Sequence, residues 1–124
     1  MSSRPQFSPY SVITDADMSA NITSQVTIIQ KLSMISYSIT WLGTAPIGAI
    51  SVEVSNDYSQ NADGSVKNAG TWNALPLSTT TNVSGNSGNG FIDIDASAGY
   101  ALRVVYTRTS GVGIMNCIVS AKVA

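Results

Sequence analysis

The sequence predicts an all-β fold, an antiparallel β-sandwich of about eight strands for which a jelly roll is the nearest variant. Several segments alternate apolar and polar side chains with a period of two, which is typical of strands with one buried face. Clusters of Gly, Pro, Asn and Asp separate these segments as turns do, and no amphipathic helix is expected between them. Each apolar strand face must be covered by a second layer, so a chain of 124 residues predicts one two-layer domain.

The N-terminal segment 1–9 is expected to be an extended arm, because Pro5 and Pro9 disfavour a helix there. Arms of this kind pack on a neighbouring chain or fray. We therefore predict two parts, an arm over residues 1–9 and a single β-sandwich domain over residues 10–124. The candidate docking residues of the arm are Arg4, Pro5, Phe7 and Pro9.

The clearest strand signal of the domain lies at 34–41, where isoleucines and aromatic side chains alternate strictly with Ser and Thr. The turn residues Gly43 and Pro46 are expected to end this strand, and the next strand begins after them. Polar loops separate the later strands. The predicted strands are 10–14, 22–30, 34–41, 47–56, 71–77 and 91–95, followed by a C-terminal hairpin.

The C-terminal segment 100–124 is predicted to be a β-hairpin with Gly111 and Val112 as its two-residue turn, because Gly at the first turn position suits a type II′ turn. This turn places Tyr106 opposite Cys117, on the more apolar of the two hairpin faces. Together with the period-two pattern of the earlier strands, it predicts a buried core. The predicted core residues are Ile35, Tyr37, Ile39, Trp41, Ile50, Val52, Val54, Leu102, Val104, Tyr106, Cys117 and Val119.

The composition of the chain disfavours several classes of function. Six Lys and Arg against seven Asp and Glu give a net charge of −1, which offers no cationic surface for nucleic acid. The chain has no His, the commonest general base and transition-metal ligand, so we expect neither an enzyme nor a cofactor. No apolar stretch is long enough for a spanning helix, and no signal peptide is evident, so we expect cytoplasmic synthesis and no membrane partner.

Four residues form the candidate surface for a ligand or a partner. Tyr58 and Trp72 flank a long polar loop, where they would make a stacking platform for a sugar ring. Sealing the rim of the core is the favoured explanation of Trp72, whereas the two explanations have equal weight for Tyr58. Arg103 and Thr107 lie on the polar face of the predicted hairpin and complete this surface.

The carboxylates suggest two further sites, each with a simpler explanation. Residues 61–65 are similar to part of a calcium-binding loop but lack its later Glu, and turn formation accounts for the same residues. Asp93 and Asp95 share one face of a strand, as two catalytic carboxylates would, but nothing in the sequence indicates a cleft around them. We therefore expect solvated turn residues and a solvated acidic pair.

About three quarters of the chain resembles small bacteriophage virion proteins, compact β-sandwiches that decorate heads or form part of tail and fibre assemblies. The residues that carry the resemblance are 51–57 (SVEVSND), 70–75 (GTWNAL), 100–113 (YALRVVYTRTSGVG) and 120–122 (SAK). The resemblance implies a non-enzymatic structural role at the virion surface, with other virion proteins as partners. It also implies a homo-oligomer, a trimer being one form. The alternative is a carbohydrate-binding or receptor-binding adhesin module with a glycan ligand.

Overall fold

The computed structural model describes residues 6–29, 34–75, 81–95 and 100–122. These residues form ten β-strands, eight of which join in one sheet, and every strand pair is antiparallel. The predicted all-β, antiparallel class is therefore confirmed, whereas the jelly-roll connectivity stays a prediction. The described residues contain no helix, and so no helix that is long and apolar enough to cross a membrane.

Two strands of 22 residues, β4 and β10, are more than twice as long as most of the others. The strands are β1 (Gln6–Asp17), β2 (Ile22–Thr23), β3 (Thr27–Ile28), β4 (Met34–Ser55), β5 (Ser59–Gln60), β6 (Val66–Asn68), β7 (Asn73–Ala74), β8 (Thr81–Val83), β9 (Ser87–Asp95) and β10 (Ala101–Lys122).

The ladder between β4 and β10 corrects the predicted C-terminal hairpin. The two halves of β10 do not pair with each other: the strand changes direction near Gly111, and both halves pair with β4, so that the pairing covers the whole length of β10. Tyr106 therefore lies opposite Ile50, and Cys117 lies opposite Ile39. The predicted end of a strand at residues 43–46 is wrong for the same reason, because β4 also continues through these residues.

Both long strands bend at the same level, and the bend folds the sheet over itself. The pairing register shifts around Ser110, which marks β-bulges in the ladder. Gly111 has φ +80° and Ala45 has φ +47°, so each strand contains a left-handed residue at the bend. Side chains hold the bent backbone, since Asn86 Oδ1 accepts a 2.9 Å bond from the Ala45 N–H and Arg108 Nε donates a 2.9 Å bond to the Gly111 carbonyl.

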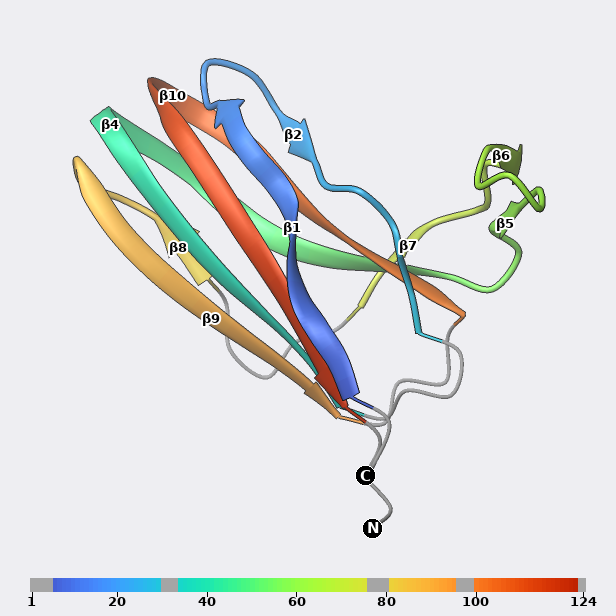
Figure 1. The fold of residues 1–124 in the computed structure, drawn as a ribbon. Helices are drawn as coiled ribbons and strands as arrows, with labels where there is room; N and C mark the ends of the chain where they lie inside the picture. The colour runs from blue at the N-terminus through green and yellow to red at the C-terminus, as the bar shows by residue number, and fades with distance from the viewer. Residues whose placement is uncertain (1–5, 30–33, 76–80, 96–99, 123–124) are drawn as a thin grey trace, which may run out of the picture.

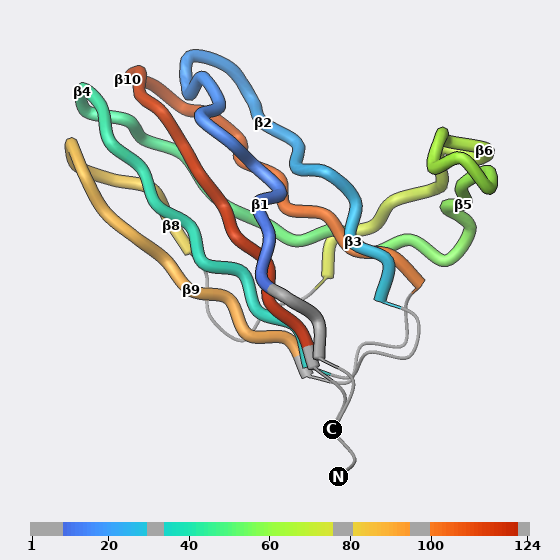
Figure 2. The backbone as a smooth tube through the Cα atoms, in the orientation of Figure 1, coloured from blue at the N-terminus to red at the C-terminus, as the bar shows by residue number. Residues whose placement is uncertain are grey.

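The bend turns one sheet into the two layers of a sandwich, as Figures 1 and 2 show. The first layer contains β1, the C-terminal half of β10, the N-terminal half of β4, and β9. The second layer contains β2 and β3, the N-terminal half of β10, the C-terminal half of β4, and the short strands β7 and β8. Strands β5 and β6 form a separate hairpin that protrudes from the second layer (Figure 1).

The predicted arm is corrected in part. Strand β1 begins at Gln6, and its pairing with β10 includes Phe7 opposite Ala121. Phe7 and Pro9 are therefore part of a sheet strand and not of a free arm. Arg4 and Pro5 lie outside the described residues.

The core between the two layers contains the side chains that the period-two pattern placed inward, together with further buried side chains such as Met18, Val83 and Met115. Of the twelve predicted core residues, eleven are buried and Val54 is half-buried against them. The run 22–30 is an exception to the burial of apolar side chains, because the polar Thr27 is buried and the apolar Val26 is only half-buried. The buried Thr27 hydroxyl lies 3.2 Å from the Tyr37 hydroxyl, so both polar groups gain a partner.

Among the glycines in the described ranges, Gly111 at the bend is the most sensitive to substitution. In Gly111→Ala, the new Cβ would overlap the carbonyl oxygen of Ala45 and would also occupy a left-handed backbone position. We expect a loss of unfolding free energy of more than about 2 kcal/mol in urea titrations. Gly64→Ala is the matched control, since Gly64 has φ +89° with open space around it, and the positive φ alone should cost about 1 kcal/mol. Equal losses in the two variants would contradict the close approach of β4 and β10 at the bend.

The buried acids of the core predict a loss of stability at alkaline pH. Burial raises the pKa of Cys117 from 9.0 to about 12, and burial likewise raises the pKa of Tyr37 above its ordinary 10.0. Above pH 9 the unfolded chain releases the Cys117 proton while the folded chain retains it, which favours unfolding. The contribution of Cys117 to the free energy of unfolding is therefore fully present below pH 9 and is lost as the pH rises toward 12. The free energy of unfolding should fall by up to about 1.4 kcal/mol per pH unit for this group.

The variant Cys117→Ala tests the assignment, because it removes the thiol and leaves Tyr37. The slope of stability against pH between 9 and 10 should become shallower in this variant, as measured by urea unfolding at each pH. An unchanged slope would show that another group is responsible.

Candidate functional site

Three of the four predicted surface residues meet at one end of the second layer. The rings of Tyr58 and Trp72 have their centroids 5.8 Å apart at an interplanar angle of 55°. The guanidinium carbon of Arg103 lies 4.2 Å from the centroid of the Trp72 ring, which is a cation–π arrangement. The sequence analysis named these residues as one surface without knowing how their strands pair. The structure brings them into contact.

Asp57 holds the loop that carries Trp72 against the end of β4. Its Oδ1 accepts hydrogen bonds from the Thr71 N–H at 2.6 Å and from the Ser55 hydroxyl at 2.9 Å, and its Oδ2 accepts one from the Thr71 hydroxyl at 3.1 Å. The Thr71 backbone bond is the main reason that the pKa of Asp57 lies below its ordinary value. The indole N–H of Trp72 donates to the Ala69 carbonyl at 2.8 Å, so its ring orientation is also set.

Strand register places Arg103 directly opposite Glu53 on β4. The two form an ion pair in which Arg103 Nη2 lies 2.7 Å from Glu53 Oε1, and the Arg103 Nε–H donates to the same oxygen. Arg103 is thus held between a carboxylate and an indole ring. We define the surface formed by Glu53, Tyr58, Trp72 and Arg103 as the Trp72–Arg103 cluster.

The geometry of this cluster does not match an open platform for a sugar. Tyr58 is only 6% exposed, so its ring face is not accessible to a ligand, and its hydroxyl accepts a 2.9 Å bond from Gln60 Nε2. Trp72 is half-exposed, and Arg103 occupies the space over its ring. Thr107 lies two outward positions further along β10, exposed and separate from the cluster.

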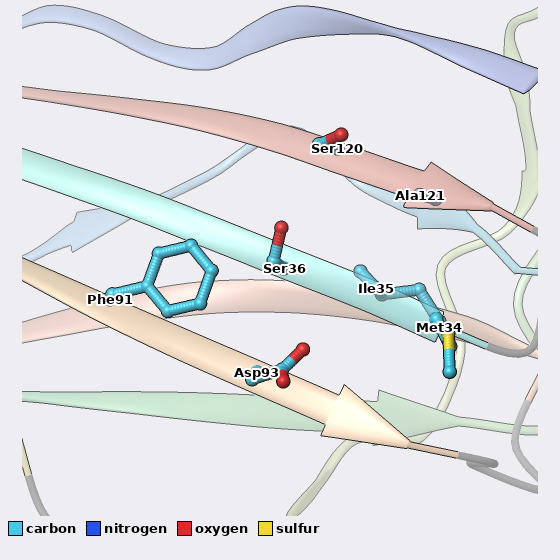
Figure 3. Close-up of a pocket in the computed structure, with 7 residues that line it drawn as sticks. All are labelled: Met34, Ile35, Ser36, Phe91, Asp93, Ser120 and Ala121. Carbon is cyan, nitrogen blue, oxygen red and sulfur yellow. The ribbon is translucent and has the colours of Figure 1, made fainter.

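A second site lies on the outer face of the first layer, where sequence reasoning expected no cleft around Asp93. The structure places a cavity of about 410 Å³ there (Figure 3). Ser36 lies at its centre on β4, with Phe91 and Asp93 of β9 on one side and Ser120 of β10 on the other. The full lining is Met34, Ile35, Ser36, Phe91, Asp93, Ser120 and Ala121.

The suggested calcium loop is a hydrogen-bonded turn in the structure. Asp63 Oδ1 accepts bonds from the Ser65 N–H at 3.0 Å and from the Ser65 hydroxyl at 2.6 Å. The Ser65 side chain is the main reason that the pKa of Asp63 is lowered. Within the described ranges, no three acidic, His or Cys side chains gather as metal ligands would.

No family model matches the sequence, and no curated protein sequence matches it. In structure, the chain is similar to the SPBc2 prophage-derived protein YomS, with a TM-score of 0.52 and 9% sequence identity over 97% of this chain and 96% of that one. It also aligns with a chain in the structure of infectious bursal disease virus, Gx strain, with a TM-score of 0.47 and 9% identity, over 94% of this chain but 31% of that chain. At such low identity, the first likeness shows that the chain shares its fold with a prophage-derived protein over nearly the full length of both.

Proposed function

We propose that this chain is a non-enzymatic structural subunit of a phage-like virion, which decorates or stabilises the capsid surface or forms part of a head or tail fibre assembly. The observation that carries the proposal is the fold shared over nearly the whole chain with a prophage-derived protein. The low charge and the absence of His agree with a structural role, since they leave few groups for acid–base chemistry. The partners are then other virion proteins, and the location is the virion surface.

The Trp72–Arg103 cluster is our candidate for attachment to the particle. Trp, Tyr and Arg are the residues most enriched at positions that dominate the energy of protein interfaces. Here Trp72 is half-exposed on a loop held by Asp57, and Arg103 is anchored by Glu53. A partner that covers the cluster would therefore meet side chains that are already ordered, so little side-chain entropy would be lost on binding.

The exposed aliphatic side chains at the bend are our candidate for contacts between copies of the chain. Leu42 is 68% exposed and lies directly opposite the exposed Ile114, and the exposed Ile47 and Val112 lie in the same bend. Exposed apolar side chains that lie together on a protein surface mark interaction sites. Subunits repeated on a particle surface meet each other, so we assign this apolar bend to a homo-oligomer, with the trimer as one form.

Attachment is tested by whether the chain sediments with assembled particles from cells that carry its gene. We expect Trp72→Ala to weaken this association by at least about tenfold, since truncating a central interface Trp costs on the order of 2 kcal/mol. Arg103→Ala should weaken it as well, and Lys67→Ala, a change of an exposed residue on β6, is the matched control with no expected effect. Unchanged melting temperatures would show that the domain remains folded. A chain that never sediments with particles would contradict the proposed function.

The apolar bend is tested by the oligomeric state of the purified chain in light scattering. We expect the parent chain to form a defined oligomer, and Leu42→Asp or Ile114→Asp to convert it to monomers, because a charge in an apolar interface loses its hydration. Val66→Asp is the control, since Val66 is also exposed but lies on the separate β5–β6 hairpin. An oligomer that persists in both bend variants would contradict the assignment of this surface, but not the role in the particle.

A further inference from the structure

The cavity around Ser36 arises from the order of side-chain sizes on the outer face of the first layer. The register places Ser120, Ser36 and Asp93 in one row across β10, β4 and β9. The next row across the same strands contains Ile118 and Phe91, which stand out from the sheet on either side of a small serine. The small side chains of the first row beside the large ones of the second row leave a hollow. Met34 borders this hollow at the end opposite Phe91 (Figure 3).

The polar groups of this hollow are not committed to bonds within the described part of the chain. Asp93 is exposed, and Ser36 and Ser120 are half-exposed. Among the described residues, none makes a side-chain hydrogen bond or an ion pair with any of these three. A carboxylate and two hydroxyls can therefore bind a ligand without breaking an internal bond.

An exposed aromatic ring stands beside these polar groups. Phe91 is 63% exposed, and Figure 3 shows its ring next to Ser36 and Asp93. Unlike Trp72, whose ring is covered by Arg103, Phe91 has no ring or cation contact among the described residues. It offers a flat apolar surface to one side of a ligand whose other side meets hydroxyls and a carboxylate.

We propose that this cavity binds a neutral saccharide unit. A pyranose has hydroxyls that donate to the Asp93 carboxylate and exchange hydrogen bonds with Ser36 and Ser120, and it has an apolar C–H face that packs on Phe91. The volume of about 410 Å³ falls within the range of roughly 300–1,000 Å³ that is usual for small-molecule sites.

Other classes of ligand fit this lining less well. An anionic ligand would be repelled by Asp93, and a purely apolar one would bury the carboxylate and the hydroxyls without hydrogen bonds. A basic side chain would pair with Asp93 and could donate to the serine oxygens, but it has no acceptor for the two serine O–H groups, and Phe is not the strongest ring for a cation. The proposal stands apart from the proposed function, because the cavity and the Trp72–Arg103 cluster lie on different layers.

The experiment is a titration of the ¹⁵N-labelled full chain with glucose, galactose, mannose, rhamnose and N-acetylglucosamine, followed through amide shifts. N-acetylneuraminic acid serves as an anionic probe, and the methyl amide of Nα-acetyl-lysine as a basic one. We expect at least one neutral sugar to shift the amides of residues 34–36, 91–93 and 120–121 in a saturable manner, and N-acetylneuraminic acid to shift them less. No saturable shift with any neutral sugar, shifts at other residues, or a response to the lysine probe alone would each overturn the proposal.

The variants Phe91→Ala and Asp93→Asn should each weaken sugar binding by at least about tenfold, since one loses the stacking surface and the other the charged acceptor. Asp93→Asn preserves the shape of the side chain, so its result remains informative where Phe91→Ala lowers stability. Asp63→Asn is the matched control, because Asp63 is an exposed carboxylate of the β5–β6 hairpin. Loss of sugar binding in these variants with normal sedimentation on particles would show that the two functions are separate.

Discussion

The constraint on which the rest of the structure depends is that β4 and β10 must bend together. They are hydrogen-bonded along 22 residues, so neither can change direction unless the other does so at the same level. The left-handed residues Ala45 and Gly111 supply this change of direction in the two strands. Without the bend, the ladder would remain one open sheet, and Tyr37 and Tyr106 would not be covered by an opposite layer.

The bend also decides which surfaces the molecule presents. Because the apolar residues of both layers face each other, the outer faces of the sandwich carry Ser, Thr and Asn together with a few exposed apolar groups. The Trp72–Arg103 cluster lies at the second layer, the Ser36 cavity lies on the first layer, and the apolar bend joins the two. The three proposed roles, attachment to a particle, contact between copies and binding of a saccharide, would therefore use surfaces that are separated in space.

The candidate site was predictable in part. Tyr58, Trp72 and Arg103 stand out in the sequence because aromatic and guanidinium groups are few in a chain that is rich in Ser, Thr and Asn. Their contact depends on the register that sets Arg103 opposite Glu53 and on the bonds from Asp57 to Thr71, and neither is a local feature. The sequence gives no indication of the Ser36 cavity, because its two serines, Ser36 and Ser120, are 84 positions apart in the chain and only the pairing of β4 with β10 brings them together.

The sequence by itself determined the all-β class and the inward face of the runs 35–41, 50–52 and 102–106, because alternation with a period of two is a property of each strand alone. It placed Ile35, Tyr37, Leu102 and Val104 inward, and the structure buries them. Only the tertiary structure decided whether the two halves of 101–122 pair with each other across Gly111 or each pair with β4. A glycine with positive φ serves a two-residue turn and a bend in a long strand equally well, and the pairing of β10 with the distant β4 is the interaction that selects the bend.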